Sequence, residues 1–241
     1  MTALSWAAAW AVAGLAAGML VNLAADLLPD RKPLRTALSC PSCGRHRPQV
    51  RWPAWWGMWA AVQCPTCGRR LAWRAVLVEL AMGGLWAFAG VRFGPSPQLW
   101  LFGAQTFVFA LVFVIDLEHK LVLNRVVLGG TAVALAGSLF WGSPPWRGAL
   151  LGGAVGFALF LLIALAKPGG MGMGDVKLAG LIGLMIGYPG VLTALFVGII
   201  AGGIGAAALL VSRRVQRGGY LPYGPFLVTG ALIGLLQAVP C

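Results

Sequence analysis

Two acidic residues stand where a carboxylate could do chemistry, in a 241-residue chain that has only six acids. Asp116 ends an apolar run, where the negative end of a helix dipole disfavours a further negative charge, so helix stability does not explain it. Asp175 follows a glycine-rich stretch and precedes another apolar run, where an Asp could also serve as a helix N-cap. Two carboxylates about 3 Å apart share one proton, and the ionised member can act as a base toward water. The pair therefore predicts peptide hydrolysis without a metal.

Glycines and a lysine surround the second aspartate. Gly172 and Gly174 have no side chains, which would let an extended substrate backbone approach Asp175 closely. Lys177 could stabilise an ionised aspartate or a developing oxyanion, or it could simply extend to the membrane surface. Transporters use paired aspartates as proton relays, so a proton-coupled transporter with a zinc-stabilised loop is the alternative from another class. Such a fold often repeats its broken helix in a second half, and the sequence has no second GxGD-like segment.

Four cysteines form a second candidate site. Cys40 and Cys43 lie in a CPSCG segment, and after 20 intervening residues Cys64 and Cys67 lie in a CPTCG segment. Two CxxC turns present four thiolates to one Zn²⁺, which predicts a structural site with no position left for a catalytic water. The zinc could hold together a loop too short for its own core, or it could support a second reaction. We expect that the nearby His46 does not bind the Zn²⁺, because four thiolates are already available.

The composition indicates which elements position these residues. The chain is 59% hydrophobic and 10% charged, with 35 glycines and a mean hydropathy of +0.84, which is typical of a membrane protein. A hydrocarbon core about 30 Å thick needs about 20 apolar residues per helix. We therefore predict an all-α, polytopic integral membrane bundle of about eight transmembrane helices with a small cytoplasmic four-cysteine module. The expected helical spans are Leu4–Leu28, Ala75–Val91, Leu99–Ile115, Val122–Trp141, Gly148–Ala166, Leu178–Tyr188, Val191–Val211 and Tyr223–Val239.

The basic residues predict the orientation of these spans. With both termini outside, 16 of the 18 Lys and Arg residues fall in the loops that face the cytoplasm, as the positive-inside rule expects. The net charge of +12 is thereby explained without a nucleic-acid partner. Asp116 and Asp175 then lie at the same cytoplasmic depth, and the cysteines lie in a compartment that keeps thiols reduced.

The predicted spans divide the chain into three parts. Residues 1–28 form a first transmembrane helix, and we expect this helix to be retained because it carries no small-residue cleavage pattern. Residues 29–74 form the zinc-binding module, which could be associated with a methyltransferase activity. Residues 75–241 form the membrane domain that holds the aspartate pair. The segment Leu178–Tyr188, followed by Pro189, is short for a full crossing, so it could be a tilted, thinned or re-entrant helix among the eight.

Several motifs together resemble the bacterial type IV prepilin peptidases, a branch of the GxGD intramembrane aspartyl proteases. The resemblance covers nearly the whole chain. It rests on the paired CPxC segments together with Gly18-Met19-Leu20-Val21-Asn22, Val78-Glu79-Leu80, Ile115-Asp116-Leu117-Glu118-His119-Lys120-Leu121, Gly172-Met173-Gly174-Asp175-Val176-Lys177-Leu178 and Leu221-Pro222-Tyr223-Gly224-Pro225-Phe226-Leu227.

The resemblance implies an aspartic endopeptidase of the bacterial inner membrane. Asp116 and Asp175 would cut the leader from prepilins or pseudopilins at the cytoplasmic face, beside membrane lipid. Many members then methylate the new N-terminus with S-adenosylmethionine, an activity associated with the cysteine module. A GxGD protease for another membrane substrate is the closer alternative. The chain has Leu123 and Asn124 where the family usually has Pro and Asp, and an apolar stretch from Trp55 to Val62 where the family is usually arginine-rich.

Overall fold

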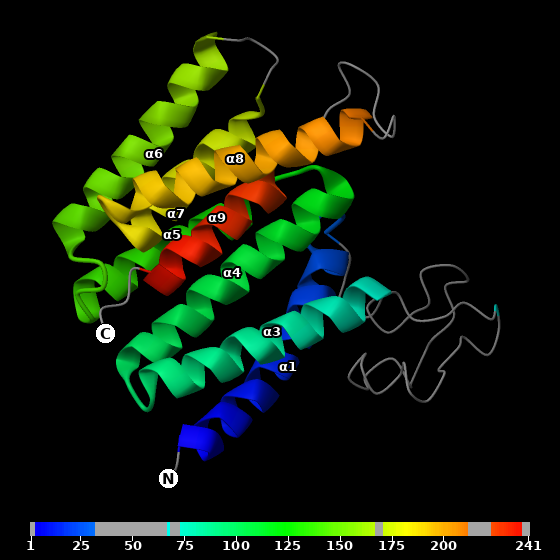
Figure 1. The fold of residues 1–241 in the computed structure, drawn as a ribbon, viewed down its shortest axis with the longest axis vertical. Coiled ribbons are helices and arrows are strands. Elements are labelled where there is room, and N and C mark those ends of the chain that lie inside the picture. The colour runs from blue at the N-terminus through cyan, green and yellow to red at the C-terminus, as the bar shows by residue number, and fades with distance from the viewer. Residues whose placement is uncertain (1–2, 32–66, 68–72, 167–170, 212–222, 238–241) are drawn as a thin grey trace. The chain divides into compact units, whose positions relative to one another are not determined.

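The computed structural model describes residues 3–31, 67, 73–166, 171–211 and 223–237. These residues form eight α-helices and no strand, which confirms the predicted all-helical fold for this part of the chain (Figure 1). The helices are α1 (Ala3–Leu27), α3 (Trp73–Phe93), α4 (Pro97–His119), α5 (Asn124–Phe140), α6 (Trp146–Ala166), α7 (Met173–Ile186), α8 (Gly190–Val211) and α9 (Gly224–Gln237). Of the four cysteines in the predicted zinc module, only Cys67 lies among the described residues.

Five helices in the described ranges are long and apolar enough to cross a membrane. They are Leu4–Leu27, Trp73–Phe93, Pro97–His119, Trp146–Ala166 and Gly190–Ala208. The helices α5 and α9 are apolar but shorter. Large hydrophobic side chains, such as Leu4, Leu139 and Phe140, are more than two-thirds exposed, as expected for surfaces that face lipid rather than water.

The chain divides into two compact units, residues 1–103 and 104–241. In the first unit, α1 and α3 pack closely along their lengths. A side chain on Gly18 would place its Cβ 2.6 Å from the Cα of Glu79, so only glycine permits this approach. The rings of Trp10 and Trp86, with centroids 5.2 Å apart, pack beside this seam.

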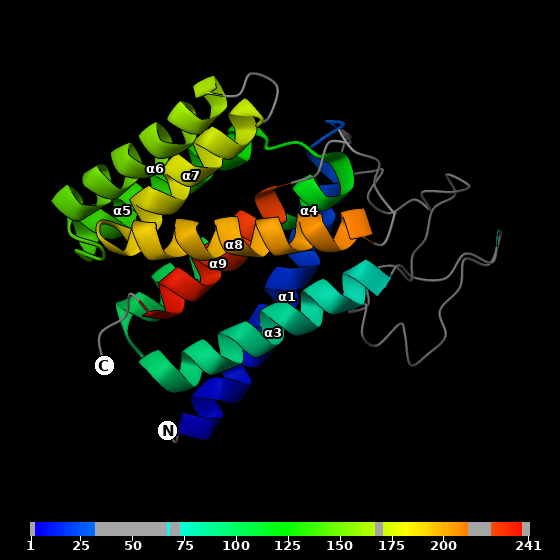
Figure 2. The same cartoon turned by 45° about the horizontal axis from the view of Figure 1, so that its top comes forward.

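The second unit is built around α7. This helix contacts α5, α6, α8 and α9, and the two views show it beside α6 (Figures 1 and 2). Ten of its residues are buried, including Val176, Leu178, Ile182 and Met185. The Gln105 side chain on α4 donates a hydrogen bond to the Met185 carbonyl oxygen, at 3.3 Å. The helix that carries Asp175 is therefore held on several sides.

The start of α7 differs from the sequence prediction. The sequence predicts an apolar helix from Val176, with the membrane span from about Leu178, but the helix begins at Met173, with Gly172 as its N-cap residue. The interpretation of Asp175 as an N-cap is thus wrong, because this residue lies inside the first turn and its N–H bonds the Gly172 carbonyl at 3.0 Å. The helix ends at Ile186, where Gly187 has a positive φ of 80°, which glycine adopts readily.

Candidate active site

Asp116 lies in the last turn of α4 and is almost fully buried, at 2% exposed. Its Oδ2 accepts a hydrogen bond of 3.0 Å from the backbone N–H of Gly224, the first residue of α9. A helix N-terminus carries partial positive charge and unpaired N–H donors. The start of α9 therefore offsets the unfavourable dipole at the end of α4, which explains how a carboxylate is tolerated there.

Asp175 lies in the first turn of α7 and is 4% exposed. A backbone hydrogen bond from Gly172 reaches its carboxylate, the geometry by which an acid in the first turn caps a helix. The carboxylate also interacts electrostatically with that of Asp116. The structure thus brings together two buried acids that lie 59 positions apart in the sequence.

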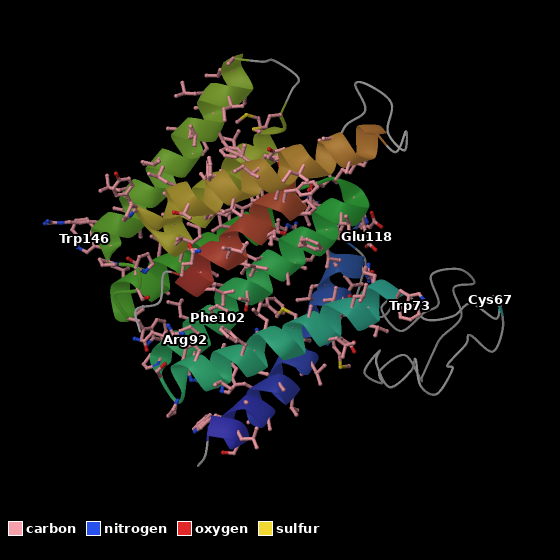
Figure 3. The ribbon with its side chains drawn as sticks, in the orientation of Figure 1. Cys67, Trp73, Arg92, Phe102, Glu118 and Trp146 are labelled. Atoms are coloured by element: carbon pink, nitrogen blue, oxygen red, sulfur yellow. The ribbon has the colours of Figure 1, made fainter. Side chains whose placement is uncertain are left out.

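This arrangement suits acid–base chemistry on a polar bond. Two interacting buried carboxylates disfavour double ionisation, so such a pair can share one proton. The ionised member can accept a proton from water while the protonated member donates one to the group under attack. Glu118, labelled in Figure 3, lies on the same end of α4 but is exposed, so it does not belong to the buried pair.

Lys177 and the glycines have contacts that the sequence did not reveal. The Lys177 amine donates a hydrogen bond of 2.9 Å to Oδ1 of Asn124, at the start of α5. A Cβ on Gly174 would lie 3.0 Å from the Cβ of Val122, in the segment that joins α4 to α5. Both contacts tie the first turn of α7 to that connecting segment.

Sequence reasoning missed Tyr223 and Gly224 as site residues. The Tyr223 hydroxyl donates a hydrogen bond of 3.3 Å to the Ile199 carbonyl on α8, and its ring covers Gly202, where a Cβ would lie 2.7 Å from Cζ. Tyr223 also lies within electrostatic reach of Asp175. The motif that contains these residues contributes to the resemblance to the type IV prepilin peptidases, but its distance along the chain from Asp116 does not predict a contact with that residue.

A separate polar cluster lies in the first unit, where α1 ends and α3 begins. The Asn22 amide donates a hydrogen bond of 3.0 Å to the Ala75 carbonyl, and Arg74 forms an ion pair of 2.8 Å with Asp26. Glu79, one turn further along α3, is 3% exposed. This cluster joins the helix ends that flank the cysteine-containing segment.

The zinc prediction falls largely outside the described residues. Cys67, labelled in Figure 3, is the one cysteine of the predicted site among the described residues, and it is exposed there. In the described ranges, no group of three or more His, Cys, Asp or Glu side chains is arranged around a metal position. The four-thiolate site therefore stays a prediction from the spacing.

The apolar helices and the buried aspartates define the class of protein: a multi-pass helical membrane protein with a carboxylate pair in its second unit. Residues 104–207 match the model of the type IV leader peptidase family. The chain is 32% identical to a prepilin leader peptidase/N-methyltransferase of Bacillus subtilis over 201 residues, which cover 82% of this chain and 80% of the relative. The chain belongs to the type IV leader peptidase family.

Further curated relatives carry the same description. Prepilin leader peptidase/N-methyltransferases of Stutzerimonas stutzeri and Pseudomonas aeruginosa are each 28% identical to the chain. Each alignment covers 82% of this chain and 70% of the relative. No solved structure matches the chain significantly. The matched family region, residues 104–207, contains both Asp116 and Asp175.

Proposed function

We propose that this protein is a prepilin leader peptidase in which Asp116 and Asp175 cleave the leader. The observation that carries this assignment is the buried, interacting carboxylate pair inside the matched family region. Family membership favours a peptidase over the transporter alternative. A prepilin of type IV pili, or a pseudopilin, is then the substrate.

The pair would act through water. The ionised carboxylate removes a proton from a water molecule, and the oxygen of that water attacks the carbonyl carbon of the scissile peptide bond. The protonated carboxyl group supplies a proton on the substrate side, and the C–N bond breaks as the leaving nitrogen is protonated. The Gly224 N–H holds the Asp116 carboxylate in a fixed orientation during this step.

The remaining parts of the molecule fit the same assignment. The basic loops support cytoplasmic placement of the active site in the inner membrane, with eight crossings that include α5, α7 and α9. The substrate's apolar helix would lie beside the enzyme in the lipid, with its basic leader at the cytoplasmic face. Residues 75–241 would form the peptidase domain, and residues 1–28 would form a first transmembrane span.

We also propose a second activity, N-methylation of the new N-terminus, because the names of the relatives include an N-methyltransferase. S-adenosylmethionine would supply the methyl group. The four thiolates of Cys40, Cys43, Cys64 and Cys67 would hold Zn²⁺ in the module of residues 29–74. Four sulfur donors are the set that a structural zinc site uses.

The decisive experiment is cleavage of a co-expressed prepilin, followed by mass spectrometry of the pilin. Asp116→Asn and Asp175→Asn should each abolish cleavage while the protein still accumulates in the membrane, because an amide can neither accept nor supply the required proton. Glu118→Gln, the same type of change on the exposed side of α4, is the matched control and should cleave normally. Near-normal cleavage by either aspartate variant would contradict the proposal that Asp116 and Asp175 are the catalytic pair.

A further inference from the structure

The segment that joins α4 to α5 lies against the first turn of α7. It begins at Lys120, whose N–H bonds the Asp116 carbonyl at 2.9 Å and whose φ is 54°. It ends at Leu123, the residue before α5. The segment is therefore attached at one end to the helix that carries Asp116. Its other end leads into α5, which packs on the helix that carries Asp175.

The first contact between this segment and α7 is steric. Val122 lies over Gly174, the residue immediately before Asp175. A Cβ added to Gly174 would lie 3.0 Å from the Cβ of Val122 and 3.2 Å from its Cγ2. These distances are shorter than ordinary carbon–carbon contacts of about 3.5–4.0 Å. Gly174 thus leaves the space that the Val122 side chain fills.

The second contact is polar. Lys177 donates its hydrogen bond of 2.9 Å to Asn124. Residues two positions apart on a helix point to different sides, so Lys177 and Asp175 face different neighbours. The amine therefore ties α7 to α5, one residue beyond the connecting segment, while the carboxylate faces its partner acid.

We propose that Val122 and Asn124 are positioning residues, which set the separation of the two catalytic carboxylates by holding the connecting segment on the first turn of α7. Gly174 and Lys177 are their partners on α7. This inference rests on the proposed peptidase function and extends it. Catalytic groups misplaced by about 1 Å can lose on the order of 100-fold in rate, so two short contacts beside the aspartates are enough to matter.

The steric contact is tested by exchanging the small and the large residue. Gly174→Ala should lower kcat for prepilin cleavage about tenfold or more with KM little changed, because the added methyl group pushes Val122 away. Val122→Gly should also lower kcat, because it removes the contact. The double variant Gly174→Ala with Val122→Gly restores one side chain in the gap, so its kcat should exceed that of either single variant. A double variant no better than the product of the two single effects would overturn the steric part.

The polar contact is tested independently, so that poor folding of one set leaves the other informative. Asn124→Ala and Lys177→Met should lower kcat by similar factors, and the combined variant should be no worse than either one. Asn124→Asp keeps an acceptor for the lysine amine and should restore cleavage to near the wild-type rate. Equal losses in Asn124→Ala and Asn124→Asp, or additive losses in the combined variant, would contradict the tether.

The wild-type chain and Asp116→Asn are assayed beside these variants. If the wild-type chain fails to cleave prepilin, the proposed function itself is wrong. If the wild-type chain cleaves and Asp116→Asn does not, the proposed function stands. The positioning role is then tested by the Gly174/Val122 double variant and by Asn124→Asp. Thermal unfolding of each purified full-length variant separates a loss of kcat from a loss of folded protein: the inference requires the kcat differences to persist among variants of equal stability.

Discussion

At the scale of single residues, Gly224 is the position where the backbone itself serves the active site. Its N–H donates to Oδ2 of Asp116, and a Cβ there would lie 2.5 Å from that same oxygen. We predict that Gly224→Ala lowers prepilin cleavage about 100-fold or more, because the methyl group displaces the carboxylate from its donor. The rate of cleavage by purified protein, compared at equal amounts of folded enzyme, measures this effect.

A glycine in open space provides the control. Among the described residues outside its own helix backbone, Gly203 on α8 has no atom within 4 Å of the position that a Cβ would take, so Gly203→Ala should cleave at the wild-type rate. Equal activity of Gly224→Ala and Gly203→Ala would show that the hydrogen bond to Asp116 has no part in catalysis.

Gly224 also shows which site residues the sequence could predict and which it could not. Asp116 and Asp175 could be chosen as candidate site residues, because ionisable groups in an apolar chain tend to mark functional sites, and the structure buries both of them. Gly224 lies 108 positions beyond Asp116 and contributes only a backbone N–H. Almost every residue type has this group, so the sequence does not indicate the contact. The contacts of Val122 and Asn124 with α7 likewise could not be predicted, although the sequence showed that Asn124 departs from the family pattern.

At the scale of elements, the packing of α6 on α7 depends on glycines on both helices. A Cβ on Gly183 would collide with the backbone of Gly152 and lie 2.8 Å from the N of Gly153. We predict that Gly183→Ala destabilises the folded protein by about 1–3 kcal/mol, the usual effect of overpacking, because backbone atoms cannot move aside as a flexible side chain can. Thermal unfolding of the purified protein should show a lower Tm.

The matched control is Gly129 on α5, where a Cβ would meet no atom of the described residues outside its own helix backbone within 4 Å. Gly129→Ala should leave Tm unchanged or raise it slightly, since alanine restricts the unfolded chain and favours helix by about 0.4–1 kcal/mol. A Tm for Gly183→Ala as high as that for Gly129→Ala would mean that the two helices can separate at little cost.

The elements themselves followed closely from the sequence. Each of the eight apolar segments forms a helix, because in a membrane the backbone must satisfy its own hydrogen bonds. The sequence predicts that the apolar helix starts after Asp175, at Val176, whereas α7 starts at Met173, because the polar and glycine residues of the GxGD stretch are typical of a loop. In the structure, Gly172 accepts the first-turn hydrogen bond and the helix extends through Asp175, which is what buries this carboxylate.

At the scale of the whole molecule, the residues of the two proposed activities lie in different parts of the chain. Asp116, Asp175 and Gly224 all belong to the unit of residues 104–241, and the family model matches residues 104–207. The four cysteines lie in the first half of the chain. Because the carboxylate pair has its hydrogen-bond partners within its own unit, cleavage should not depend on the cysteine module.

We therefore predict that loss of zinc separates the two activities. The full-length protein, purified without chelators and with its cysteines reduced, should contain about one equivalent of zinc, since four thiolates close one tetrahedral site. Cys64→Ser should lose most of this metal and leave the processed pilin with an unmethylated N-terminus, while cleavage proceeds at a rate near that of the wild type. Elemental analysis and the mass of the processed pilin measure these outcomes together. Loss of cleavage in a Cys64→Ser protein whose membrane helices remain folded would show instead that the cysteine module acts on the aspartate pair.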